Sequence, residues 1–265
     1  MNHFVKTWKG LLRRAFPFSG PDTGSARAAY IRPIQVPMRP PFIVPFRQWV
    51  VTAVIAVLAA GCLTIEENYT FKKDGSGTME YVVDLSAFAD MMKSVKGLSG
   101  SADKDDGMGE MDMKDEAGKL KGVPGISKVK VKEEQDGFVQ RITFRFADVD
   151  ALNRALNVLL PDSTGAGHGF FAWEGSTLVR TNNLHAAEMG SGLTPDEGDT
   201  LDMSGMLKSM MYKYSFTFDQ AIGEVGLAPG VIREDPSPKQ VKLSTDWSVI
   251  MADPKALDLR ITVNK

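Results

Sequence analysis

One uncharged apolar run divides the chain and limits what either side of it can fold into. It extends from Trp49 to Gly61, and Arg39 and Arg47 precede it. Such a run is too short to cross a bilayer, which takes ~20 apolar residues. Its basic flank and small final residues are instead typical of a secretory signal. A buried helix would need an amphipathic pattern, whereas this run is apolar on every side.

The end of this run carries a short motif, LAAGC, at Leu58 to Cys62, and Cys62 is the single cysteine of the chain. The motif resembles the lipobox of bacterial lipoproteins. The resemblance implies cleavage between Gly61 and Cys62, a diacylglyceryl group on the Cys62 thiol and an acyl group on its new amine. Two or three chains would hold the protein stably on a membrane, whereas a single chain binds only marginally.

The residue after the cysteine bears on which membrane is used. Leu63 stands where some bacteria place an aspartate to retain lipoproteins in the inner membrane. The resemblance therefore favours the outer membrane in a cell that has one. Beyond Cys62 no long uncharged apolar run occurs, so the lipid is the expected membrane anchor.

The segment before the signal, residues 1–37, is not expected to fold. Its basic residues outnumber the single acid, Asp22, and four prolines would break any helix. Met38 then opens a conventional signal peptide over 38–61. We expect 1–37 to be a disordered extension, with translation beginning at Met38.

Charge separates the two sides of Cys62. Residues 1–61 hold eight Lys/Arg and one acid, a net charge of +7, so the whole-chain charge of −2 leaves 62–265 near −9. This charge repels nucleic-acid phosphates, and we predict no nucleic-acid partner. Without a second cysteine, 62–265 must be stabilised by its core rather than by an internal disulfide.

Three stretches of alternating apolar residues, each broken by a glycine-containing turn, predict β-hairpins. Their turns lie at 73–77, 135–137 and 174–176, and further strands are expected at 212–218, 240–243 and 257–263. In the first hairpin Ile65, Tyr69 and Phe71 share one face, which Glu67 interrupts.

The first hairpin, FKKDGSGT at Phe71 to Thr78, is similar in sequence to uncharacterised bacterial lipoproteins, including those with an LppM-like domain. This resemblance implies an α+β domain of the cell envelope, with lipid or glycolipid contact as one role.

Helices are predicted between the hairpins. One follows Asp84 over 85–96, and a second is capped by Asp148 and ended by Pro161. A third carries a stripe from Met203 to Met211. Residues 97–122, rich in glycine and charge, predict a mobile loop, and the region around Pro229 and Pro236 predicts a looser segment. Together these elements predict an α+β fold with antiparallel sheets built from hairpins and helices packed on one face.

No motif for catalysis is present, and nothing distinguishes a general acid or base among the carboxylates. His168 and His185 are expected at the surface, so we predict no enzyme and no cofactor. Thioethers of Met108, Met111 and Met113 offer a weak alternative, a Cu(I) site.

The sequence therefore favours a lipid-anchored, non-catalytic binding or scaffold module that meets an envelope protein or lipid. A lipid or glycolipid carrier is the alternative. An enzyme with an unrecognised site is the third class.

Overall fold

The computed structural model describes residues 63–264 except 88, 91–112, 162–164, 166, 182–184, 186–187 and 189–202. The predicted signal peptide, Gly61 and Cys62 lie outside the described residues, as does the extension 1–37. Of the helix predicted over 85–96 only the beginning is described, where the Ala89 amide donates to the Leu85 carbonyl at 3.0 Å.

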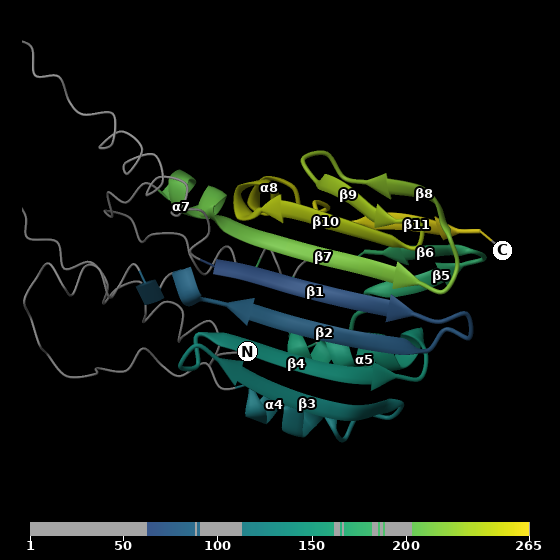
Figure 1. The fold of residues 1–265 in the computed structure, drawn as a ribbon, viewed down its shortest axis with the longest axis horizontal. Helices are drawn as coiled ribbons and strands as arrows, with labels where there is room; N and C mark the ends of the chain where they lie inside the picture. The colour runs from purple at the N-terminus through teal and green to yellow at the C-terminus, as the bar shows by residue number, and fades with distance from the viewer. Residues whose placement is uncertain are drawn as a thin grey trace, which may run out of the picture.

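The described residues form two sheets (Figure 1). The first has seven strands, in the order β3 (Ile126–Glu134), β4 (Val139–Phe146), β2 (Gly77–Asp84), β1 (Leu63–Phe71), β7 (Met210–Phe218), β10 (Gln240–Asp246) and β9 (Ile232–Ser237). The second has four, in the order β5 (Phe171–Glu174), β6 (Thr177–Arg180), β11 (Leu259–Val263) and β8 (Ile222–Leu227). The described helices are α4 (Lys114–Leu120), α5 (Val149–Leu159), α7 (Met203–Ser209) and α8 (Trp247–Ala252).

The large sheet is centred on β1, and one of its pairings corrects the expectation of purely antiparallel sheets. β1 pairs antiparallel with β2 but parallel with β7, with Leu63 opposite Met210 and Phe71 opposite Phe218. Parallel neighbours need a long crossover connection. Here the chain between β1 and β7 includes two hairpins and α5. The fold is therefore α+β with a mixed main sheet.

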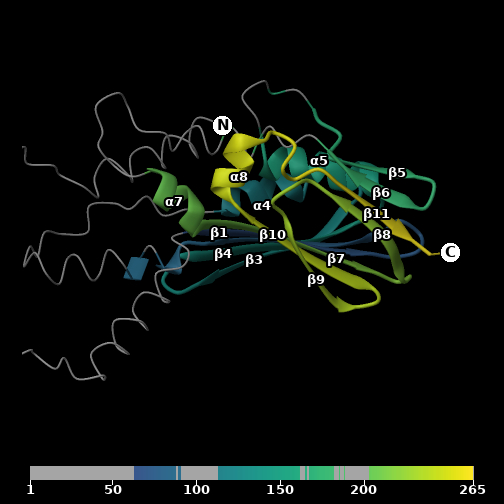
Figure 2. The same cartoon turned by 90° about the horizontal axis from the view of Figure 1, so that it is seen from above.

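Strict alternation along the central strands places the core on one face of the large sheet. Ile65, Tyr69 and Phe71 are buried, as the period-2 pattern predicts. The Phe71 ring stacks on Phe218 at 5.6 Å and meets Phe146 at 5.4 Å between centroids. Figure 2 shows α5, β5 and β6 on the same side of the large sheet, so these elements help to close this core.

The predicted cap of α5 is confirmed. The Asp148 carboxylate accepts a hydrogen bond from the Ala151 amide at 2.7 Å, which satisfies one of the unpaired donors of the first turn. The buried side chains of the helix are Ala151, Leu152, Ala155 and Leu156.

Two local predictions are wrong. The loop predicted over 97–122 ends in α4, because Ala117 and Leu120 bury against the core although charged residues surround them. The helical stripe from Met203 ends at Ser209, since Met210 and Met211 belong to β7. Met210 fits both a helical stripe and an alternating strand, and pairing with β1 settles the choice.

The predicted looser segment near Pro229 and Pro236 also needs correction, because it contains β8 and β9. All six residues of β9 are exposed, so no apolar alternation marks the strand in the sequence. β9 lies at the sheet edge, where a proline such as Pro236 is tolerated. Among the described residues, no helix is long and apolar enough to cross a membrane.

Close packing at Gly77 gives the first prediction. A Cβ there would lie 2.0 Å from the Thr70 carbonyl oxygen and 2.4 Å from Cζ of Phe146. We expect Gly77→Ala to lower the free energy of unfolding by about 1–3 kcal/mol or more, through overpacking. The control is Gly118→Ala in α4, where a Cβ meets nothing within 4 Å and helix propensity gains up to about 1 kcal/mol. Urea unfolding measures both, and equal effects would contradict this packing.

Candidate functional site

A buried ion pair connects the two sheets. Glu67 of β1 is 0% exposed, and Arg180 of β6 is 1% exposed. Nη1 of Arg180 lies 2.9 Å from Oε2 of Glu67, and Nη2 donates to Oε1 at 3.2 Å. Glu67 thus interrupts an apolar face because its partner comes from the opposing sheet.

Tyrosine hydroxyls complete the coordination of this carboxylate. Tyr69 donates to Oε2 of Glu67 at 2.8 Å, and Tyr212 donates to Oε1. Three hydrogen bonds, from Nη2 of Arg180 and the two tyrosine hydroxyls, therefore converge on one carboxylate, which is acceptor-only when ionised, and Nη1 of Arg180 adds an ion-pair contact. Charge-assisted hydrogen bonds of this kind offset part of the cost of removing the charge from water.

Aromatic rings surround the guanidinium. Its central carbon lies 5.3 Å from the Tyr214 ring centroid and 5.6 Å from that of Phe171, within the range of cation–π attraction. Among the described residues, Nε and Nη1 of Arg180 and the Tyr214 hydroxyl have no hydrogen-bond partner, although Nη1 lies at ion-pair distance from Glu67. The rings therefore provide contacts to the buried cation that hydrogen bonds do not.

The surroundings shift the pKa values of the buried tyrosines upward. For Tyr69, Tyr81 and Tyr212, burial is the main cause and the Glu67 charge adds to it. For Tyr214, burial raises the pKa to about 12, although Arg180 acts in the opposite direction. All four tyrosines are therefore neutral at physiological pH.

His185 corrects one prediction from sequence, because it is buried at 3% exposure rather than on the surface. Its Nε2 lies 3.3 Å from the Tyr212 hydroxyl, and its ring meets Phe170 edge-on at 5.5 Å between centroids. His168 is partly exposed, and its backbone amide donates a hydrogen bond to Oδ1 of Asn157 at 2.8 Å. His168 also meets the Phe170 ring, at 6.3 Å between centroids, so both histidines lie against this one aromatic ring.

The cluster around Glu67 has the composition of an active site without access to a substrate. Perturbed groups concentrate at functional sites, but structural ion-pair networks perturb them too. Glu67, Arg180, Tyr69 and Tyr212 are each at most 1% exposed. In this conformation the cluster joins the sheets and contacts no solvent.

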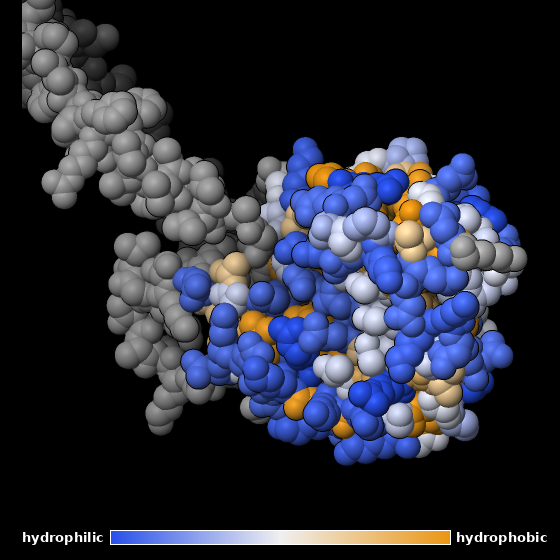
Figure 3. Space-filling view, turned by 45° about the vertical axis from the view of Figure 1, so that its right-hand side comes forward, coloured by the Kyte–Doolittle hydropathy of each residue, from blue (hydrophilic) through white to orange (hydrophobic). Residues whose placement is uncertain are grey.

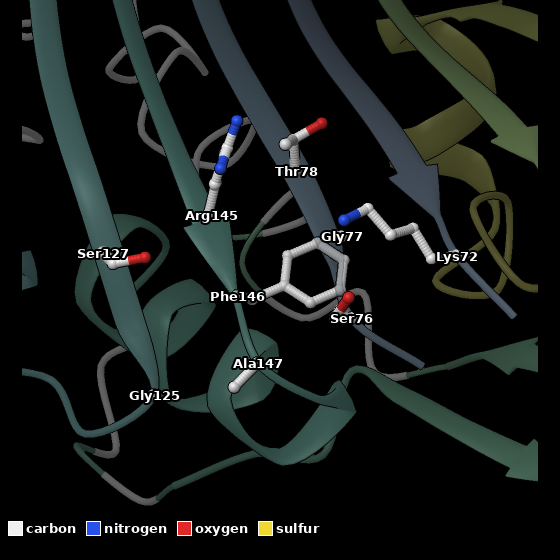
Figure 4. Close-up of a pocket in the computed structure, with 9 residues that line it drawn as sticks. All are labelled: Lys72, Ser76, Gly77, Thr78, Gly125, Ser127, Arg145, Phe146 and Ala147. Carbon is white, nitrogen blue, oxygen red and sulfur yellow. The ribbon is translucent and has the colours of Figure 1, made fainter. Parts of the chain in front are cut away.

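The second candidate site is an open pocket at the end of the large sheet that carries the β1–β2 turn (Figure 4). Its volume is about 210 Å³, and Figure 4 shows Lys72 approaching from the β1 side and Ser127 from the β3 side. The lining combines two cations, three hydroxyls and an apolar floor: Lys72, Arg145, Ser76, Thr78, Ser127, Gly77, Gly125, Phe146 and Ala147.

Hydrogen bonding inside the turn fixes one wall of this pocket. The Asp74 carboxylate accepts from the Ser76 hydroxyl at 2.7 Å and from the Ser76 amide at 3.0 Å. These bonds, and to a smaller extent the charge of Lys72, lower the pKa of Asp74. Asp74 is thus ionised, and its carboxylate is held within the turn by these hydrogen bonds.

Metal-binding residues do not gather in the described part of the chain, where no group of three His, Cys, Asp or Glu could hold an ion. Of the thioethers considered for copper, Met113 is buried next to α4. Met108 and Met111 lie outside the described residues.

The surface near the pocket is mostly hydrophilic. Figure 3 brings the end with the β1–β2 turn forward and shows apolar colour only in small, separate areas. Ile232, 61% exposed, is the only large exposed apolar side chain in the described ranges. On the face shown, polar ligands therefore find more partners than apolar ones.

Comparison with known proteins finds no family model that matches this chain and no matching curated protein. Among solved structures, the chain is similar to the NMR structure of the folded domain of LppM from Mycobacterium tuberculosis, with a TM-score of 0.36 and 12% identity. The match covers 77% of this chain and 91% of that domain. LppM is the kind of protein that the first hairpin resembles in sequence, but a likeness this weak carries no functional argument.

The buried pair gives the second prediction. Glu67→Gln replaces an acceptor-only group by an amide whose NH₂ must face donors. We expect a loss of about 3–5 kcal/mol in unfolding free energy, as when one partner of a buried pair is removed. Glu66→Gln is the matched control, because Glu66 forms an ion pair with Lys213 at 3.5 Å on the outer face of the sheet. Such a surface ion pair contributes under about 1 kcal/mol to the free energy of unfolding. Similar losses in both variants would refute the buried ion pair of Glu67 as a stabilising interaction.

Alkaline titration gives the third prediction. A tyrosine whose folded pKa is raised stabilises the fold fully below the unfolded pKa of about 10 and loses this contribution as pH rises above it. In a Tyr30→Phe chain, which retains the four buried tyrosines, we expect no phenolate absorbance near pH 10 before unfolding begins. Ionisation of a tyrosine at its ordinary pKa in the folded chain would show that the cluster is open to solvent.

Proposed function

We propose that this chain is a lipid-anchored, non-catalytic binding module of the bacterial cell envelope, tethered through Cys62. The observation that carries the proposal is the position of β1, which begins at Leu63, directly after the lipobox cysteine. A strand at Leu63 places the described fold within one residue of the proposed cleavage site, which would make Cys62 the first residue.

The tether would attach at one end of the central strand. β1 has nine residues, and strands rise about 3.3 Å per residue, so its two ends are roughly 30 Å apart. A lipid on Cys62 would hold the Leu63 end near the membrane. The β1–β2 turn and the pocket beside it would then face away from that membrane.

Burial supports the absence of catalysis in this proposal. The tyrosines and the arginine with raised pKa values lie in the core, and the open pocket has no histidine or cysteine and no carboxylate in its lining. The pocket is also smaller than the ~300 Å³ at which sites for drug-sized ligands begin. It therefore suits a small polar group rather than the acyl chains that a lipid carrier must enclose.

Charge and the residue after the cysteine give the rest of the proposal. With a net charge near −9 over 62–265, we propose an envelope protein or small polar molecule as partner and no nucleic acid. Leu63 favours the outer membrane where the cell has one.

The fourth prediction tests the anchor in the native bacterium, using an alkyne fatty acid and the mass of the mature protein. The unaltered chain should carry the label and begin at Cys62. Cys62→Ser should lose the label and the cleavage after Gly61, because the acceptor thiol is gone. Thr64→Ser, two residues further, should behave as the unaltered chain. A Cys62→Ser protein that is still cut at this bond and still labelled would end the proposal.

A further inference from the structure

We propose that the pocket beside the β1–β2 turn binds a small phosphate-type anion, through Lys72 and Arg145. This inference rests on the proposed function, since it names the ligand class of the binding module. Its basis is the distribution of charge over the outer face of the large sheet, opposite the core.

The outer face carries cross-strand rows, and the row nearest the turn contains no acid. Register places its members side by side across five strands: Thr217, Thr70, Thr78, Arg145 and Ser127. The next two rows include Glu80 and Glu66. Carboxylates on this face thus begin about 7 Å from the row of Arg145, at two residues per row.

Several other cations on this face form ion pairs. Arg141, four residues before Arg145 on the same strand, lies 2.8 Å from Glu80, and Lys213 lies 3.5 Å from Glu66. Arg145 and Lys72 form no ion pair with any described residue. Asp74 offsets part of the Lys72 charge, but its carboxylate is held by Ser76. A chain with a net negative charge therefore retains a local positive site here.

The lining supplies what an oxyanion needs besides charge. Thr78 and Ser127 offer hydroxyl donors on either side of Arg145, and neighbouring strands lie about 4.8 Å apart, so the three side chains span roughly 10 Å. A guanidinium can bind two phosphate oxygens at once, and a lysine adds a point charge. A pocket of about 210 Å³ holds a phosphate group with several waters.

The bulge in β3 next to the pocket supports a defined geometry. Pairing with β4 shifts between Ser127 and Lys130, and Lys128 has a φ of 54°. A non-glycine residue at positive φ is uncommon, and bulges redirect the side chains beside them. The bulge therefore sets the direction of Ser127 at the pocket rim.

Two sources of phosphate share this chemistry, a free phosphate compound and a lipid headgroup. The roughly 30 Å between the tether and the pocket would keep headgroups of the anchoring membrane out of reach. The full chain should be extracted in dodecyl maltoside, an uncharged detergent, and titrated with pyrophosphate in a calorimeter. Vesicles of phosphatidylglycerol, and vesicles of phosphatidylcholine as the zwitterionic reference, should then be tested as competitors.

We expect saturable pyrophosphate binding that weakens as salt rises, because the contacts are partly exposed. Lys72→Gln and Arg145→Gln should each weaken it by about tenfold or more, the value of one charge-assisted contact. Lys242→Gln is the matched control, since it removes the same charge from the same face, about 19 Å from Arg145. It should change the affinity for pyrophosphate less than twofold.

Competition by phosphatidylglycerol vesicles alone would support the inference and identify a headgroup as the source, whereas no competition would support a free phosphate compound. Absent binding, or binding equally weakened by Lys242→Gln, would overturn the inference. Lipid labelling of Cys62 distinguishes this failure from failure of the anchor, because it does not depend on the pocket.

Discussion

The Glu67–Arg180 ion pair is the interaction on which the joining of the two sheets depends. It connects the central strand of the seven-stranded sheet to β6 of the four-stranded sheet, with both side chains fully buried. Removing two charges from water costs several kcal/mol per ion, so such a pair is kept only with close geometry and further contacts to both ions. Tyr69 and Tyr212 complete the bonding to the carboxylate, and aromatic rings cover the guanidinium.

Burial explains how the structure can hold strongly perturbed groups at a place that no substrate reaches in this conformation. Burial and then the Glu67 charge raise the pKa values of Tyr69 and Tyr212. At Arg180 burial lowers the pKa, but the Glu67 charge, helped by the neighbouring tyrosines, raises it overall. The effect of these buried groups is to fix which strand of one sheet faces which strand of the other, because a one-residue slip would point Glu67 away from Arg180. The pocket lies instead near the turn of the first hairpin, on polar side chains.

Local patterns predicted the hairpins and the Asp148 cap because alternation, turn glycines and capping residues act over a few residues. The partner of Glu67 could not be predicted, since Arg180 is 113 residues away in the sequence. The parallel β1–β7 pairing has no local signal either, and β9 lacks alternation because it is exposed throughout. Of the candidate site, the turn residues 73–77 were predicted as a turn, but Arg145 and Ser127 join them only through strand register.

A double-mutant cycle on Glu67 and Arg180 tests the central claim most directly. Unfolding free energies would be measured for Glu67→Gln, Arg180→Met and the double variant. If the pair joins the sheets, the double variant should be more stable than the sum of the single losses implies, with a coupling of about 2 kcal/mol or more. Each single variant leaves a lone buried charge, whereas the double variant leaves none. Losses that add within about 0.5 kcal/mol would show that the two side chains do not depend on each other, and would contradict the account.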